Sequence, residues 1–155
     1  MDRDKYYEML ALADSGERDK TLAWCFYVLD GLKNEIEKID KLLDLSYMTP
    51  HILLPVLAFA LEREHITKRE FAILNAVVKD PDMCIKSSSL ESIIGKESSV
   101  QRSRIIGKLK EKHMLIPLKK GGRIYTIGFA NNYLLRGVMH VLEQNGFIPA
   151  SLNKK

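Results

Sequence analysis

The sequence has few cysteines, few aromatic residues and no segment of biased composition. It holds 2 Cys, 9 Gly and 5 Pro among 155 residues. Two cysteines cannot build the disulfide framework of a small secreted protein, and the Gly and Pro contents exclude a collagen-like or mucin-like chain. With 46% apolar and 28% charged residues, the chain also differs from a disordered polymer. We therefore expect one globular domain or two very small ones.

Long apolar runs are lacking as well. The most apolar window, residues 52–61, is about half of the ~20 residues that a helix needs to cross a bilayer, and it contains Pro55. No membrane span is therefore expected. The charged N-terminus is not followed by an apolar run that ends in a cleavage site, so secretion is not expected either. Cys25 and Cys84 have apolar neighbours, which is typical of reduced thiols in a cytoplasmic protein.

Familiar catalytic and cofactor motifs are absent from the sequence. Gly95-Lys96 and Gly107-Lys108 lack the earlier Gly and the following hydroxyl of a phosphate-binding loop. The four His residues stand alone, without the spacing that places two ligands on one zinc ion. Spacing does not exclude a triad built on either cysteine, but a thiol among apolar residues behaves as a small inert hydrophobe. We expect no enzymatic activity, no metal site and no cofactor.

Charge is unevenly distributed along the chain, although the net charge is only +4. Residues 1–65 hold 8 Lys or Arg against 13 Asp or Glu, a balance of −5. Residues 66–130 hold 13 against 6, a balance of +7. Such a basic segment is found in proteins that bind a polyanion, and also in ordinary solvated faces. A nucleic-acid site is therefore sought in the middle of the chain.

Residues 1–48 are expected to form a helical segment, in which a turn around Gly16 separates a short helix from a long one. Apolar residues of the long helix follow each other at alternating intervals of three and four: Leu22, Cys25, Leu29, Leu32, Ile36, Ile39 and Leu43. This spacing favours packing against another helix of the same chain. The alternative is the seam of a homodimer. The start of the helix, around Trp24 and Phe26, is apolar nearly all round, which indicates burial on more than one side.

Two sequence signals mark helix starts after residue 48. Thr49 is expected to cap a helix that has Pro50 at its first position, where no amide hydrogen is needed. Thr67 and Glu70 form a capping box, in which each side chain bonds the backbone of the other residue. Both signals place amphipathic helices at the beginning of the second part of the chain.

The rest of residues 49–155 has the element order of a winged helix-turn-helix. We expect a short strand near residues 83–86, a short helix near 87–94 and a tight turn near 95–97. A third helix is expected near residues 98–113, a hairpin near 115–128 and a last helix near 132–144. We therefore predict a mainly α protein. Its helical segment is followed by a winged helix-turn-helix with a small β wing and a closing C-terminal helix.

The third helix and the hairpin carry residue types that bind DNA. Arg can bond guanine and Gln can bond adenine, whereas Lys, Ser and a helix N-terminus bind phosphate. The predicted DNA-binding residues are Ser98, Ser99, Gln101, Arg102, Arg104 and Lys108 on the helix and Lys119, Lys120 and Arg123 on the wing. Lys110 and Lys112 add to the basic character of the same helix.

The run Arg3-Asp4-Lys5-Tyr6-Tyr7-Glu8-Met9-Leu10, the turn at Gly16, and Trp24 and Phe26 carry a family resemblance. This part of the chain resembles the segment that follows the catalytic core in Fic-domain proteins, which transfer AMP or related groups onto protein hydroxyls. Many members continue into a C-terminal winged helix. The family's catalytic signature, His-Pro-Phe followed by Gly-Asn-Gly-Arg, is absent. The resemblance therefore implies a C-terminal fragment, a separately expressed tail or a gene without its catalytic part, with a Fic catalytic core as a partner.

Two functions of different classes follow from these observations. The charge and the winged-helix pattern favour binding of double-stranded DNA, as in a transcriptional regulator. The alternative is a non-catalytic regulatory or protein-docking C-terminal domain of a Fic-type AMP transferase. Binding of random duplex DNA distinguishes the two, because a docking module has no need to bind it.

Overall fold

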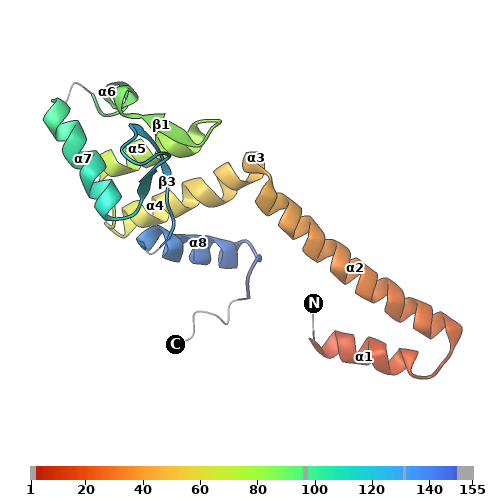
Figure 1. Cartoon of the computed structure of the whole chain (residues 1–155). Coiled ribbons are helices and arrows are strands. Elements are labelled where there is room, and N and C mark those ends of the chain that lie inside the picture. Colours follow the sequence, from red (N-terminus) through yellow and green to blue (C-terminus); the bar gives the residue numbers. More distant parts are fainter. Residues whose placement is uncertain (1–2, 96–97, 131, 150–155) are drawn as a thin grey trace. The chain divides into compact units, whose positions relative to one another are not determined.

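The computed structural model describes residues 3–95, 98–130 and 132–149, and the chain is mainly helical (Figure 1). The helices are α1 (Arg3–Ala13), α2 (Arg18–Leu43), α3 (Leu45–Met48), α4 (Leu54–Glu62), α5 (Lys68–Lys79), α6 (Leu90–Ile94), α7 (Ser99–Glu111) and α8 (Tyr133–Gln144). A π-helical stretch, η1 (Thr49–Leu53), joins α3 to α4, and a 3-10 turn, η2 (Ser87–Ser89), precedes α6. The strands are β1 (Cys84–Lys86), β2 (Leu115–Pro117) and β3 (Ile124–Ile127).

The chain divides into two compact units between Asp44 and Leu45. We call residues 1–44 the helical hairpin and residues 45–155 the winged unit. In the helical hairpin α1 packs against α2, and Gly16 in the turn between them has a φ of +73°, which glycine adopts without strain. Half-buried side chains such as Leu10 of α1 and Trp24 of α2 mark the faces in contact.

The apolar stripe of α2, from Leu22 to Leu43, is exposed. No residue of α1 or α2 is buried. The Leu and Ile side chains of the stripe expose between 45% and 77% of their surface. The intrachain packing that the spacing favours is therefore not found within the helical hairpin, because α1 packs against a different face of α2.

The winged unit begins with a continuous helical run over α3, η1 and α4. The expectation that Thr49 caps a new helix is wrong, because the chain is already helical from Leu45 and Met48 has helical backbone angles. Pro50 lies within the π-helical stretch, and Pro55 is the second residue of α4. Proline has no amide hydrogen to donate and disturbs a regular α-helix, and the irregular stretch of this helical run contains Pro50.

The helical run Leu45–Glu62 is longer than residues 52–61, the apolar window that was judged too short to cross a membrane. By length and composition alone, these 18 residues, with a mean hydropathy of 1.3, are sufficient to cross a membrane. Its buried residues, which include Val56 and Leu57, belong to the part of the run that packs against α5 and α8. In the whole run, 28% of the residues are buried.

The core of the winged unit lies where α4 meets α5 and α8. Leu57, Leu74 and Leu134 come from these three helices, and none of them exposes any surface. At Gly137 of α8 an added Cβ would lie 3.1 Å from Cγ1 of Val56, so the glycine allows α8 to approach α4 closely. The closing helix predicted from the sequence is thus part of the core.

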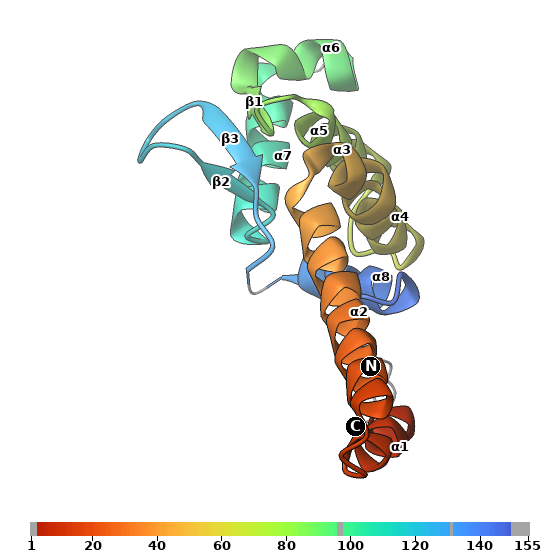
Figure 2. The same cartoon turned by 90° about the vertical axis from the view of Figure 1, so that its right-hand side faces the viewer.

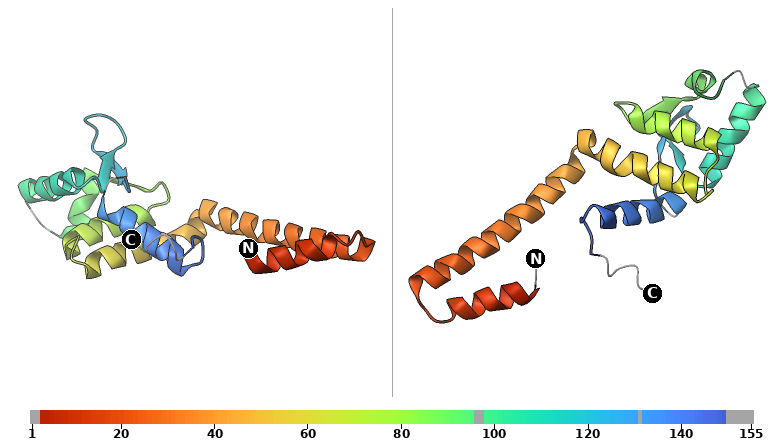
Figure 3. Two further views of the ribbon diagram at one scale, coloured as in Figure 1. Left: turned by 90° about the horizontal axis from the view of Figure 1, so that it is seen from below. Right: turned by 180° about the vertical axis from the view of Figure 1, so that it is seen from behind.

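A small antiparallel sheet completes the winged unit. The strand order is β1-β3-β2, with Ile85 opposite Tyr125 and Ile116 opposite Thr126. The sequence order α5, β1, α6, α7, β2, β3 with this sheet is a winged helix-turn-helix, which confirms the predicted fold class. The loop between β2 and β3 is the wing, and it projects from the unit in Figures 2 and 3.

Local signals position the elements of the winged unit. The predicted capping box of α5 is confirmed: the Thr67 amide donates to Glu70 Oε2 at 2.8 Å, and the Glu70 amide donates to Thr67 Oγ1 at 3.3 Å. At the wing tip the Gly122 amide donates to the Lys119 carbonyl at 2.8 Å, and Gly121 has a φ of +75°. A type II turn requires this positive φ at its third residue. Of the predicted tight turn at residues 95–97, Lys96 and Glu97 lie outside the described residues.

Candidate nucleic-acid interface

Helix α7 is anchored to the core by one face and exposes the opposite one. Ile106 and Leu109 are buried. Val100, Arg104 and Lys108 are exposed and follow each other at intervals of four, so they share one face of the helix. Two predicted DNA-binding residues, Arg104 and Lys108, therefore lie side by side on the outward surface.

The two polar residues at the start of α7 bond each other. Ser98 is the N-cap, and its Oγ accepts a hydrogen bond from the Gln101 amide at 3.2 Å. Gln101 Oε1 in turn accepts from the Ser98 amide at 3.3 Å. This capping box starts the third helix, and it occupies the side-chain oxygen of Gln101. Gln101 therefore stabilises the start of α7. To bond adenine, its side chain would have to break the hydrogen bond with the Ser98 amide.

Arg102 is held by a neighbouring helix. Its Nη1 lies 2.9 Å from Glu91 Oε2 of α6, and its side chain is only 22% exposed. This ion pair connects α6 to α7 and partly neutralises the guanidinium. Arg102 therefore lies along the side of α7, whereas Arg104 is exposed on the outward face.

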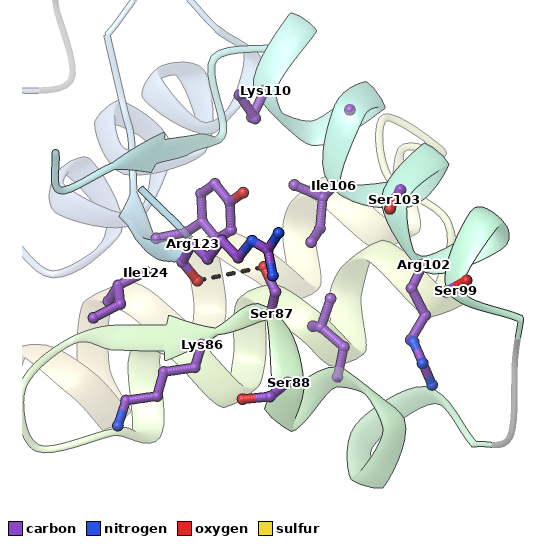
Figure 4. Close-up of a pocket in the computed structure, with 13 residues that line it drawn as sticks. Lys86, Ser87, Ser88, Ser99, Arg102, Ser103, Ile106, Lys110, Arg123 and Ile124 are labelled. Carbon is purple, nitrogen blue, oxygen red and sulfur yellow. Dashed lines mark hydrogen bonds between the residues drawn. The ribbon is translucent and has the colours of Figure 1, made fainter. Parts of the chain in front are cut away.

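A groove with a volume of about 720 Å³ runs between α7, the β1–η2 junction and β3 (Figure 4). It contains four cationic side chains, five hydroxyl groups and a few apolar side chains. Its polar lining residues are Lys86, Ser87, Ser88, Ser99, Arg102, Ser103, Lys110, Arg123 and Tyr125. Among the described residues that line the groove there is no Asp or Glu. The groove has the donors that bind an anion of the size of a phosphodiester.

The wing is attached to this groove through Arg123. The amide and the hydroxyl of Ser87 both donate to the Arg123 carbonyl, at 2.9 Å and 3.3 Å, and these bonds fix the backbone from which the guanidinium projects (Figure 4). Lys119 and Lys120 are exposed in the turn at the wing tip. Of the three cations predicted on the wing, one therefore lines the groove and two lie beyond it.

Lys112, at the end of α7, has a structural role. Its Nζ lies 2.9 Å from Oε1 of Glu70, which is buried, and it also donates to the His65 carbonyl at 3.2 Å. Burial raises the pKa of Glu70, but hydrogen bonds from Lys112 and Thr67 outweigh that effect and hold the pKa below its usual value. Lys112 thus connects the C-terminal end of α7 to the start of α5 and is not available for a ligand.

Several groove residues were missing from the sequence-based prediction. Lys86, Ser87 and Ser88 precede α6, and only the pairing of β1 with β3 brings them next to the wing. Ser103 and Lys110 lie on the side of α7 that faces the groove, at a spacing of seven residues that maintains one helical face. The run Lys-Ser-Ser-Ser was a visible signal, but sequence spacing alone does not place it beside a hairpin some thirty residues later.

No protein-family model matches this chain, and no curated protein matches it. Within the described residues, no group of three His, Cys, Asp or Glu side chains is placed to hold a metal ion, and Cys25 and Cys84 are free thiols. The candidate site is therefore defined by geometry and charge alone.

Proposed function

We propose that the winged unit binds double-stranded DNA and that the chain acts in the cytoplasm as a transcriptional regulator without an enzymatic activity of its own. The observation that supports this proposal is the groove beside α7, where Lys86, Lys110 and Arg123 converge from three segments. Such convergence is what a phosphate backbone requires, because it presents one negative charge after another along a curved path.

The outward face of α7 suits the edges of the bases. In a winged helix-turn-helix the N-terminal residues of the third helix contact bases in the major groove. Arg104 can form two hydrogen bonds to guanine, and Val100, which is 58% exposed, can contact the methyl group of thymine. Lys108, one turn further, lies where a phosphate or a guanine can accept its hydrogen bond. The wing tip, with Lys119 and Lys120, adds contacts to the backbone.

Protein docking is the second candidate function, and one observation favours it. Ile116 of β2, Leu118 just after β2 and Ile124 of β3 are 44%, 54% and 39% exposed. An apolar patch of this kind suits a protein surface better than a phosphate backbone. In this alternative the winged unit is the docking part of a Fic-type protein.

Fluorescence anisotropy with a labelled random duplex of about 20 base pairs tests the proposal. If five cations of the site contact phosphates, the log-log slope of affinity against salt is about −4.5, and a fourfold rise in salt weakens binding by roughly 500-fold. We expect binding at low micromolar protein in low salt. Absence of binding at tens of micromolar protein contradicts DNA binding and leaves the docking function.

A matched pair of variants locates the site. Lys110→Glu with Arg123→Glu reverses two groove cations, and Lys68→Glu with Arg136→Glu reverses one Lys and one Arg that do not line the groove. Both double variants change the net charge by the same amount. The groove variant is expected to lose at least tenfold in affinity and the control less than about threefold, with unchanged circular dichroism. An equal loss in both would mean that only net charge matters.

A further inference from the structure

The stripe of α2 is a long exposed apolar surface without a partner in its own unit among the described residues. It extends over 21 residue steps from Leu22 to Leu43, which is about 32 Å of helix. Its Leu and Ile side chains are each at least 45% exposed, and Leu43 reaches 77%. Phe26, beside the stripe, is 69% exposed. A soluble protein rarely leaves a continuous apolar surface of this length uncovered.

Helix α1 does not cover this surface. The half-buried residues of α2 that face α1 include Trp24, Val28 and Gly31, which lie at helical intervals of four and three. They form a second face of α2, next to the stripe. In the helical hairpin, one face of α2 therefore packs against α1, and the face that carries the stripe is not covered by α1.

We propose that the stripe of α2 is the seam through which two copies of this chain associate, so that two helical hairpins form a four-helix arrangement. The alternating spacing of three and four along the stripe is the spacing at which each side chain fits between those of an identical helix. The spacing therefore allows α2 to pack against a second copy of itself, and no different partner helix is needed.

The charges of α2 also suit a second copy. Its 26 residues contain five Lys or Arg and five Asp or Glu, with the two signs interspersed, so the helix is neutral. The excess of acidic residues in residues 1–44, 11 Asp or Glu against 7 Lys or Arg, lies outside α2, so two copies of α2 carry no net charge toward each other. A DNA backbone or an anionic lipid surface has no net charge on α2 to attract it.

The area of the stripe is close to what a stable dimer needs. Phe26 and the six Leu and Ile side chains of the stripe, each at least 45% exposed, offer on the order of 100 Å² apiece, together on the order of 700 Å² per copy. A standard protein interface buries about 800 Å² on each partner. The contribution of α1 and the rim of α2 would bring the interface to that size.

Light scattering after size-exclusion chromatography, applied to the full chain between about 5 and 200 µM, tests the seam. The wild-type chain is expected to elute as a dimer at the upper concentrations. Ile36→Asp places a carboxylate in the middle of the stripe and is expected to give a monomer at every concentration. The control, Asn34→Asp, adds the same charge two residues away, about 200° around the helix, and is expected to remain dimeric.

The measured oligomeric state tests the seam independently of DNA binding. The wild-type chain and the control variant also bear on it, so the test does not rest only on whether Ile36→Asp folds. A wild-type chain that is monomeric at about 200 µM contradicts the seam, and the stripe then belongs to a different partner, such as a Fic catalytic core. Loss of the dimer in both Ile36→Asp and Asn34→Asp also contradicts it. Circular dichroism and the duplex-binding assay at low protein concentration check that Ile36→Asp retains a folded winged unit.

Discussion

The two units of this chain use similar helices in different ways. In the winged unit, α5 buries Ile73, Leu74, Val77 and Val78 because α4, α6 and the sheet surround one of its faces. In the helical hairpin, α2 is twice as long and has a regular apolar stripe, yet it buries no residue. Regular apolar spacing in the sequence therefore predicts a helix face that can pack. Whether that face is buried depends on whether the chain also provides a second apolar surface to cover it.

The two units also differ in how their charged side chains are arranged. The winged unit concentrates four cations around one groove. The ion pairs of α2, such as Lys38 with Glu35 at 3.0 Å, join neighbouring residues of one helix and balance each other. A ligand of high negative charge therefore suits the winged unit, and a second apolar surface suits the helical hairpin.

Matched truncations of leucine test this comparison most strongly. Leu74→Ala in α5 removes a fully buried side chain, and the resulting cavity is expected to cost about 2–5 kcal/mol of unfolding free energy. Leu12→Ala in α1 removes a side chain that is 42% exposed and outside the stripe of α2, and it should cost less than about 1 kcal/mol. Urea unfolding followed by circular dichroism measures both. Equal losses would mean that the helical hairpin has a core of its own.

Two lysines of α7 provide a second contrast. Lys112→Met leaves the buried Glu70 carboxylate without its cation and is expected to cost about 2–4 kcal/mol. Lys108→Met, on the exposed face, should change stability by less than about 0.5 kcal/mol but weaken duplex binding. Thermal unfolding and anisotropy, carried out on the same two proteins, separate the roles. A stable Lys112→Met protein would contradict the structural role of the pair.

The smallest expected effect is a difference in acid sensitivity. Because the pKa of Glu70 is held below its usual value in the folded chain, its ionised form stabilises the fold above about pH 4.3, and this contribution is lost as the pH falls through the folded pKa. Glu70→Gln should therefore lose less stability than the wild type between pH 6 and pH 3.

Glu35→Gln is the matched control for that experiment. A hydrogen bond from Lys38 lowers the pKa of Glu35 as well, but the pair is exposed on α2, where water screens it. Its melting temperature should follow that of the wild type across the pH range. If Glu70→Gln also follows the wild type, the buried pair does not control the acid response.

The fold of the winged unit was predictable because its signals are local. The capping box at Thr67, the serine cap of α7 and the glycine turn of the wing each act within a few residues. The start of α4 was not predictable from Thr49 and Pro50. The preceding residues already form a helix, and the π-helical stretch accommodates proline without a new cap.

The candidate site was only partly predictable because it depends on strand pairing. Arg104, Lys108 and the wing lysines could be identified from their positions on a helix or a turn. The contributions of Lys86 and Ser87 follow from the register of β1 with β3, which three-residue strands do not reveal in sequence. The pairing of Arg102 with Glu91 is likewise a contact between separate helices.

Nuclear magnetic resonance of the 15N-labelled chain, titrated with random duplex DNA at low salt, tests whether the groove beside α7 binds DNA. We expect the amide signals of Ser87, Ser103 and Lys110 around the groove and of Gly121 on the wing to shift together and to saturate with one affinity. The signal of Gly137, buried between α8 and α4, should not move. Shifts confined to α2 or α8, or no shifts at tens of micromolar DNA, would contradict the assignment of the groove as a DNA interface.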